Sequence, residues 1–184
     1  MNTQRLAITL WPEWAYAVAH LGKNIENRTW EPPDGLLGQM IAIHGGVSIG
    51  GRASKKPGFA IEAIRQMTLT AAMCGQSEHV LRTITPGVVT EKGRGIVAVA
   101  RLKGVHRHPE GLRWYAGDNL FGWVLGDVYT LPMPVPCMGA QGLWRLHPET
   151  LEAVRIQLRK MKSQAAGACL DGRGSDQVAE ERTE

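Results

Sequence analysis

Short apolar runs bounded by glycine or proline recur along most of the chain. They alternate with polar positions or are apolar throughout, which is typical of β-strands. Six runs predict strands, at residues 5–10, 23–30, 39–44, 95–105, 122–131 and 143–146. Pro132, Pro134 and Pro136 come directly after the fifth run. Because proline has no N–H to donate, we expect them to interrupt strand pairing and to leave an edge or crossing segment.

Longer segments show the spacing of amphipathic α-helices instead. The first begins at Pro12, a residue suited to the first helical position, and ends near Gly22. The second extends from Gly58 to Met73. The third covers residues 148–162 and has one apolar stripe, formed by Leu151, Val154, Leu158 and Met161.

Two segments show neither periodicity. Residues 76–94 are expected to be irregular, and residues 163–184, rich in Gly, Ala, Ser, Asp and Glu, are expected to form a disordered tail. Several short strands with interposed helices predict an α+β fold, a mixed barrel rather than a parallel doubly wound sheet.

The composition is that of an ordinary globular protein, with 43% hydrophobic and 21% charged residues. No run approaches the ~20 apolar residues of a membrane span, and the N-terminus shows no signal-peptide pattern, so we expect no membrane contact and a cytoplasmic protein. The three cysteines form no C-x-x-C pair, and the close pair His106 and His108 has no further ligands at metal-site spacing. The sequence therefore predicts neither a metal site nor a cofactor.

The net charge of +4 hides an asymmetry along the chain. Residues 163–184 hold five acids against two bases, so residues 1–162 hold 19 bases and 12 acids, a net charge of +7. A basic body favours polyanionic partners. Seven cations could form such a surface or could simply be solvated: Arg52, Lys55, Lys56, Arg101, Lys103, Arg107 and Arg113.

Charged and aromatic residues gather just after the first predicted helix. If residues 24–30 are extended, Glu26, Arg28 and Trp30 share one face of the strand, and Lys23 can lean over the same place. The Arg28 guanidinium is a planar fork suited to a phosphate or a base edge, and Trp30 could stack on a base. The alternative is a structural Glu26–Arg28 ion pair, with Trp30 as a core or rim aromatic residue.

Two further residues are candidates for the same site. His44 stands at a strand end before two glycines, where it could line a cleft or be a hydrogen-bonded structural histidine. Trp114 lies in a glycine-bounded segment, where it could stack on a base or cover the edge of the barrel. Of Trp11 and Trp14, which flank the start of the first helix, we expect at least one to pack in the core, and we expect the same of Trp123 and Trp144.

The motif G-x-K-x-x-E-x-R is matched by Gly22, Lys23, Glu26 and Arg28. With its flanks, this part of the chain resembles the ASCH (activating-signal-cointegrator homology) family of the PUA-like superfamily, in its bacterial and phage form. The supporting segments are Trp11-Pro12-Glu13-Trp14-Ala15, residues 38–44, residues 121–128 and residues 139–144.

The resemblance implies an ASCH domain over residues 1–147 with an insertion at about 47–94, followed by the helix at 148–162 and the tail at 163–184. It implies a β-barrel with a cleft beside the motif and roles in RNA or DNA binding. Some members hydrolyse an acylated cytidine, through the motif lysine and a threonine, and others are reported as ribonucleases.

Lys23 matches that lysine, but Glu26 stands where the threonine would be. A neighbouring carboxylate raises the pKa of a lysine, so in a catalytic reading Glu26 is the base and Lys23 holds an anionic or carbonyl oxygen.

We therefore expect the chain to bind RNA, DNA or a modified nucleoside. The ligand-binding residues that we expect are Lys23, Glu26, Arg28, Trp30, His44 and Trp114. One alternative is a hydrolase of a modified nucleoside, or a ribonuclease, that uses Lys23 and Glu26. Another is a protein-interaction adaptor that uses the terminal helix and keeps its fold without it. The oligomeric state is left open.

Overall fold

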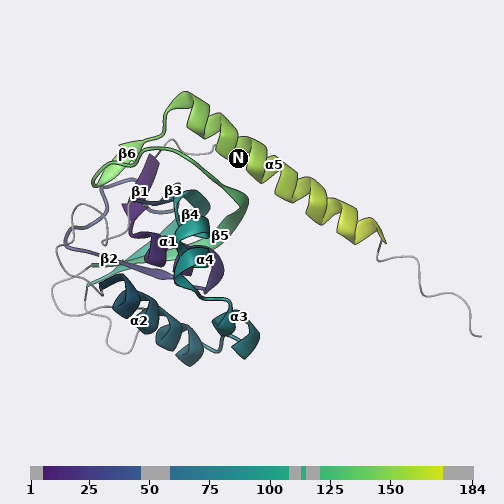
Figure 1. Ribbon diagram of the computed structural model, residues 1–184. Coiled ribbons are helices and arrows are strands. Elements are labelled where there is room, and N and C mark those ends of the chain that lie inside the picture. The colour runs from purple at the N-terminus through teal and green to yellow at the C-terminus, as the bar shows by residue number, and fades with distance from the viewer. Residues whose placement is uncertain (1–5, 47–58, 108–112, 115–120, 172–184) are drawn as a thin grey trace, which may run out of the picture.

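The computed structural model describes residues 6–46, 59–107, 113–114 and 121–171, and the structural statements below concern these residues (Figure 1). The strands are β1 (Leu6–Leu10), β2 (Ile25–Arg28), β3 (Met40–Gly45), β4 (Gly95–His106), β5 (Phe121–Val135) and β6 (Leu143–Arg145). The helices are α1 (Pro12–His20), α2 (Phe59–Met73), α3 (Glu78–Arg82), α4 (Pro86–Lys92) and α5 (Pro148–Asp171).

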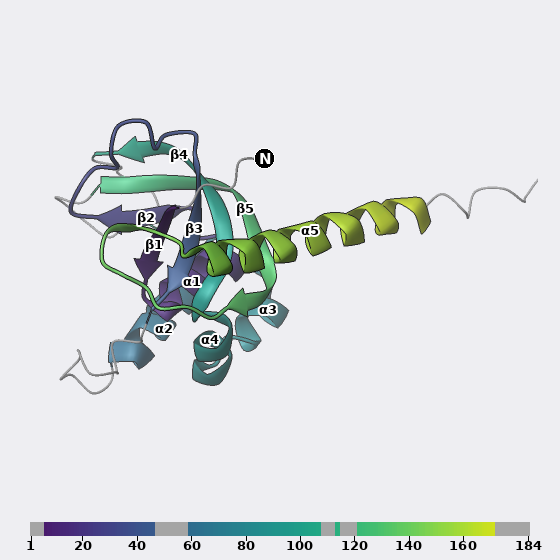
Figure 2. The same cartoon turned by 90° about the horizontal axis from the view of Figure 1, so that it is seen from above.

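The six strands form one mixed sheet in the order β2-β5-β4-β3-β1-β6. Only β1 and β3 pair in parallel, and the other neighbours are antiparallel. The sheet curls into a half-barrel (Figure 2). The structure thus confirms the α+β class and the six predicted strands. β6 pairs only with Leu6–Ile8, so the last two residues of β1 extend beyond it. We call this unpaired edge of the half-barrel the seam.

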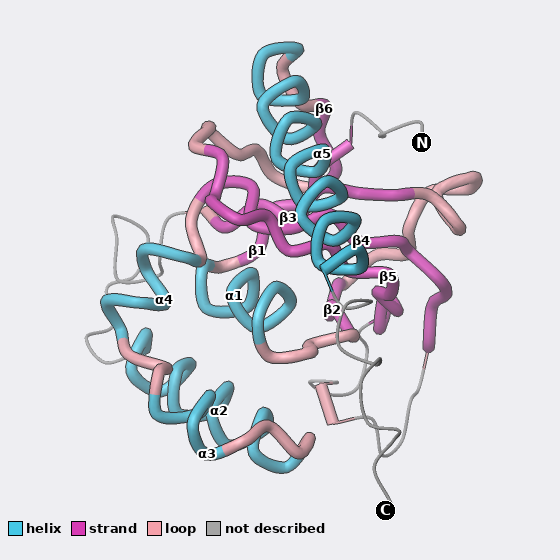
Figure 3. The backbone as a smooth tube through the Cα atoms, turned by 90° about the vertical axis from the view of Figure 1, so that its right-hand side faces the viewer, coloured by secondary structure: helices cyan, strands magenta, loops and turns pink. Residues whose placement is uncertain are grey.

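Four helices cover one side of the sheet in two layers. α1 packs on β3, β4 and β5, and α2 and α4 pack on the outer side of α1 (Figure 3). α2, α3 and α4 lie within the segment that we expected to be an insertion. α1 is consequently buried nearly all round, since even Glu13 and Tyr16 are covered.

α5 packs against β5 on the other side of the molecule, and its C-terminal half projects away from the domain (Figures 1 and 2). Leu151 and Val154 at its start belong to a buried cluster with Ala7, Ile96 and Leu131. The first turns of α5 are therefore part of the core. Removing this helix would therefore expose apolar core residues, which argues against the expectation that the chain keeps its fold without it.

Three expectations about boundaries were wrong. Residues 76–94 contain α3 and α4, which begin at the N-caps Ser77 and Thr85. β5 continues past Pro132 and Pro134, because the ladder to β4 shifts register there and the prolines need not donate to it. α5 runs to Asp171, beyond the predicted end of the helix. Residues 172–184 lie outside the described part of the chain.

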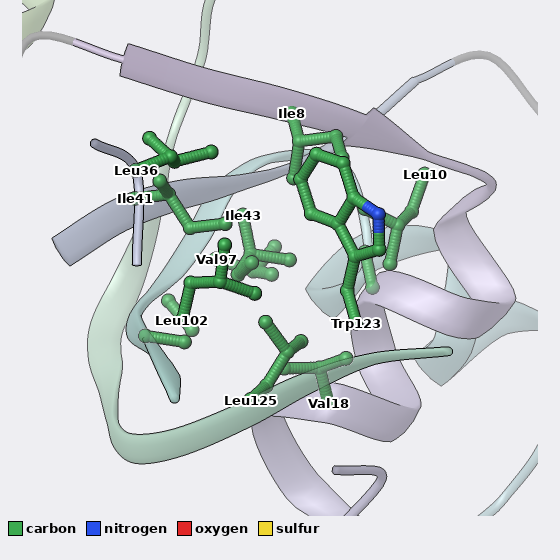
Figure 4. Packing of buried hydrophobic residues seen from close by; sticks show 13 residues of the cluster. Ile8, Leu10, Val18, Leu36, Ile41, Ile43, Val97, Leu102, Trp123 and Leu125 are labelled. Atoms are coloured by element: carbon green, nitrogen blue, oxygen red, sulfur yellow. The ribbon is translucent and has the colours of Figure 1, made fainter. Parts of the chain in front are cut away.

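The largest core cluster surrounds Trp123, whose side chain is fully buried. Aliphatic residues from β1, β3, β4, β5 and α1 enclose its indole (Figure 4). The expectation that Trp123 packs in the core is confirmed. Trp14 is half-buried against this cluster, whereas Trp11 is exposed.

Backbone segments from three elements approach each other closely at the end of β3. A Cβ placed on Gly45 would lie 1.5 Å from the carbonyl oxygen of Gly93, just past α4. A Cβ on Gly93 would in turn lie 2.4 Å from the carbonyl oxygen of Pro12 at the start of α1. Only glycine fits at these positions, and the contact fixes the end of β3 next to His44.

We expect Gly45→Ala to lower the free energy of unfolding by at least ~2 kcal/mol, because the methyl group would force backbone apart in a packed region. Gly87→Ala in α4 is the matched control, since a Cβ there meets nothing within 4 Å and alanine is favoured in helices. Urea unfolding of both variants measures the difference. Equal stability of the two would contradict the close approach of β3 and α4.

Candidate functional site

The side chains of Lys23, Glu26 and Arg28 converge on one carboxylate. Gly22, at φ 71°, turns the chain from the end of α1 towards β2. Lys23 Nζ donates to Glu26 Oε2 at 3.0 Å and to the carbonyl oxygen of Ile25. Arg28 Nη2 lies 3.2 Å from Glu26 Oε1. The two cations thus occupy the two oxygens of a single carboxylate.

This triad is largely buried. Lys23 is 3% exposed and Glu26 is 8% exposed, while the side chain of Arg28 is 19% exposed and is the member that solvent reaches most. Burial lowers the pKa of Lys23; Arg28 lowers it further, and Glu26 opposes both. Glu26 does raise the pKa of Lys23, as expected, but the net shift is downward because desolvation outweighs the ion pair.

Arg28 also bridges the seam of the half-barrel. Its Nη2 donates to the carbonyl oxygen of Thr9 at 2.7 Å, so β2 at one edge of the sheet is tied to β1 near the other edge. Both contacts of the guanidinium use Nη2. Its Nε is buried and has no hydrogen-bond partner among the described residues. An unpaired buried donor is unfavourable, so an acceptor placed there would stabilise the site.

His44 lies across the seam from this triad and is 2% exposed. Its Nδ1 is 3.2 Å from Thr9 Oγ1, and its Nε2 is 3.2 Å from the carbonyl oxygen of Cys137. A carbonyl can only accept, so Nε2 carries the proton. Burial lowers the pKa of His44, with the Cys137 hydrogen bond opposing, which favours the neutral ring.

Trp30 does not continue the strand that carries Glu26 and Arg28. β2 ends at Arg28 and the chain bends, so the predicted shared face does not reach residue 30. The half-buried Trp30 ring lies edge-on to Trp123, with 4.7 Å between ring centroids, and its carbonyl oxygen accepts from Trp123 Nε1. The expectation that Trp30 shares one strand face with Glu26 and Arg28 is therefore wrong.

Trp114 is buried rather than open for stacking. It is 6% exposed and packs in a cluster with Tyr16, Ile25 and Met67. Its carbonyl oxygen accepts from Asn27 Nδ2 at 2.9 Å. Since Asn27 alternates with Glu26 and Arg28 along β2, Trp114 lies on the opposite face of this strand. The expectation of an accessible stacking ring is corrected accordingly.

Sequence reasoning missed Thr9 and Trp144 as members of this network. Trp144 Nε1 donates to Thr9 Oγ1 at 3.0 Å, and its ring is half-buried rather than fully in the core. A lone threonine in the apolar run of β1 was the available signal, because a polar group in a buried strand needs a partner.

The expected basic surface is partly neutralised. Arg101 and Lys103 both pair with Asp127, at 2.8 and 2.7 Å, and Arg107 pairs with Glu31. Arg113 is exposed, and residues 47–58, which include the cations at 52, 55 and 56, lie outside the described part of the chain. Charge alone therefore does not define a binding face here.

The described part of the chain contains no group of three or more His, Cys, Asp or Glu residues that could hold a metal ion. His108, in the close histidine pair noted above, lies outside it. None of the described helices is long and apolar enough to cross a membrane.

No family model and no curated protein matches this sequence. Among solved structures, the chain is similar to ASCH from Zymomonas mobilis, with 15% identity and a TM-score of 0.42 over 83% of this chain and 94% of that chain. Two single-residue variants of that protein are also similar, with 15% and 14% identity and TM-scores of 0.42. They cover 81% and 83% of this chain, and 94% and 95% of their own.

We expect Glu26→Gln to lower the free energy of unfolding by about 3 kcal/mol, because it leaves two buried cations without their carboxylate. Glu62→Gln is the matched control, since it removes an exposed carboxylate that pairs with Arg65 on the surface of α2 and should have little effect. Urea denaturation monitored by tryptophan fluorescence measures both. Comparable small effects would show that the triad is not the buried unit described here.

Proposed function

We propose that the chain binds RNA, or a modified nucleoside, at the Arg28 end of the Lys23–Glu26–Arg28 triad. The observation that carries this proposal is the convergence of the three charged groups of the G-x-K-x-x-E-x-R motif on one carboxylate. The resemblance to nucleic-acid-binding proteins of the ASCH family rests on the same motif. Arg28 is the member through which a ligand would be met, because it is the most exposed of the three.

The chemistry of Arg28 favours an anionic or carbonyl oxygen as the ligand atom. The Thr9 carbonyl and the Glu26 carboxylate hold one nitrogen of the guanidinium, while Nε lacks an acceptor among the described residues. A phosphate oxygen or the oxygen of a base edge would accept from the exposed part of the guanidinium, since the side chain is 19% exposed, and RNA-binding proteins commonly read unstacked bases in this way.

An aromatic platform would complete such a site. Trp11 directly follows β1 and is 42% exposed, which makes it the exposed tryptophan of the described chain. It lies two positions after Thr9, whose carbonyl Arg28 contacts. We propose Trp11 as the stacking ring, with half-buried Trp30 at the end of the strand that bears Arg28. Stacking contributes ~1–3 kcal/mol per base in proteins that bind single strands.

Arg28→Gln should weaken binding of a short single-stranded RNA at least about tenfold, because it removes the charge while an amide can still donate to Thr9. The salt dependence should fall as well, by about 0.7 in the slope of log affinity against log salt for each phosphate that is no longer neutralised. Fluorescence anisotropy at several salt concentrations measures both quantities.

Arg82→Gln, which removes an exposed arginine from α3, is the control and should leave affinity and slope unchanged. Near-ultraviolet circular dichroism of each variant checks folding. RNA affinity that is indifferent to both salt and Arg28 would refute the proposed site.

A second function, hydrolysis of a modified nucleoside or of RNA, is favoured by the state of Lys23. Its amine is buried with a lowered pKa, and its Nζ lies 3.0 Å from a Glu26 oxygen. A lowered pKa favours the neutral amine, which is the form that can accept a proton, and here Glu26 would hold that amine in place. The roles inferred from the sequence, with Glu26 as the base, are then exchanged.

Lys23→Met should reduce turnover of an acylated cytidine or of RNA by at least about a hundredfold, the scale on which general bases contribute. Binding should be less affected, because Arg28 remains. Release of acid or of RNA fragments, followed across pH, measures the loss. Lys103→Met removes an exposed lysine outside the triad and should retain turnover. A wild-type protein that binds these compounds and turns over none of them would exclude the hydrolase.

A further inference from the structure

Thr9 contacts Arg28 and His44 through different atoms. Its carbonyl oxygen accepts from Arg28 Nη2, and its hydroxyl oxygen lies within hydrogen-bond distance of both His44 Nδ1 and Trp144 Nε1. An indole N–H can only donate, so Thr9 Oγ1 accepts from Trp144. The threonine hydrogen is then free to be donated to Nδ1 of the neutral His44 ring.

Thr9 has no strand-pairing partner in β6, on the side of the seam. β6 pairs with β1 only from Leu6 to Ile8, so the pairing on this edge stops one residue before Thr9. On its other side, Thr9 stands opposite His44 in the parallel ladder with β3. The hydroxyl contacts to His44 and Trp144 therefore fix the residue whose carbonyl holds Arg28.

His44 itself is closed off from any ligand. Its two ring nitrogens are occupied by Thr9 and by the Cys137 carbonyl, and the ring lies edge-on to Trp144 with centroids 5.5 Å apart. Gly139 covers the remaining approach, since a Cβ there would lie 2.4 Å from His44 Cε1 and 2.7 Å from Thr9 Oγ1. Because its ring is enclosed, His44 can influence ligand binding only through the residues that it contacts.

We propose that Thr9 is a positioning residue for Arg28, held by His44 and Trp144, and that His44 does not touch the ligand. The proposal rests on ligand binding at Arg28 and replaces the ligand-contact role first expected for His44. An arginine side chain is long and flexible, and the Thr9 carbonyl is the nearer of its two anchors, at 2.7 Å against 3.2 Å to Glu26. Orienting that carbonyl orients the guanidinium.

The test compares Thr9→Val, which keeps the shape of the side chain and removes the hydroxyl, with Thr9→Ser, which restores it. Guanidinium N–H signals of Arg28 in the full chain, identified by their absence in Arg28→Gln, report its immobilisation by NMR. Anisotropy of a short single-stranded RNA reports affinity. Thr9→Val should broaden or lose the Arg28 signals and weaken RNA binding by roughly two- to tenfold, and Thr9→Ser should recover both.

Thr130→Val is the matched control. Thr130 is a half-buried threonine of β5 whose hydroxyl donates to the Ala19 carbonyl, so its replacement removes one comparable hydrogen bond elsewhere. It should change stability without changing the Arg28 signals. If Thr9→Val does not fold, Trp144→Phe removes the indole donor, keeps an aromatic ring and should loosen Arg28 in the same way.

The two readouts separate this inference from the proposed function. Arg28 signals that persist unchanged in Thr9→Val would overturn the positioning role, whether or not RNA binds. Loosened Arg28 with unaltered RNA affinity would also overturn it, provided that Arg28→Gln weakens binding. A wild-type protein that binds no RNA or nucleoside would refute the proposed function, and the NMR comparison would still decide whether Thr9 holds Arg28.

Discussion

The Glu26 carboxylate neutralises two cations inside the protein, and the geometry around β2 depends on it. Desolvating a lysine and an arginine is unfavourable unless close partners offset it. One carboxylate does so here by giving one oxygen to each cation. Lys23 can therefore be buried at the turn between α1 and β2, and Arg28 can extend from the strand towards the opposite edge of the sheet. Hydrophobic side chains in place of these charged residues could fill the space, but they could not donate a hydrogen bond to the Thr9 carbonyl oxygen.

The half-barrel is joined at its seam by a side chain rather than by a strand ladder. Ladder hydrogen bonds are repeated along a strand, so the loss of one leaves its neighbours in place. The Arg28–Thr9 contact is a single charge-assisted bond between strands that are four places apart in the sheet order. In the proposed function, the residue that meets the ligand is thus also the one that ties β2 to β1. Binding at Arg28 would then be coupled to the width of the seam through one guanidinium.

Sequence periodicity predicted those parts of the fold whose physics is local. The six strands, α1 and α2 follow from apolar spacing, and the convergence of Lys23, Glu26 and Arg28 follows from a helix end placed before an extended segment. α3 and α4 were missed because their evidence is a single capping residue each, Ser77 and Thr85, rather than a repeated pattern. β5 was cut short at its prolines because a register shift depends on the partner strand, which the sequence of β5 does not contain.

The errors at the site have a common cause. Alternation along β2 separates Asn27 from Glu26 and Arg28, but it does not reveal which distant segment covers either face. Trp114 proved to cover the Asn27 face, and Thr9 proved to meet Arg28, although both contacts join residues far apart in the chain. Burial of Lys23 is likewise a property of the whole fold. It reversed the direction of a pKa shift that local charge alone would give.

The position of α1 between the sheet and the helices α2 and α4 has a consequence for what the chain can lose. A helix at a protein surface normally keeps one polar face, but α1 is buried on both of its sides, with Ala15 and Val18 in the Trp123 cluster and Tyr16 in the cluster with α2 and α4. A shortened chain without α2–α4 would expose an apolar helix to water. The segment α2–α4 and the apolar outer face of α1 therefore depend on each other, because each covers apolar surface of the other.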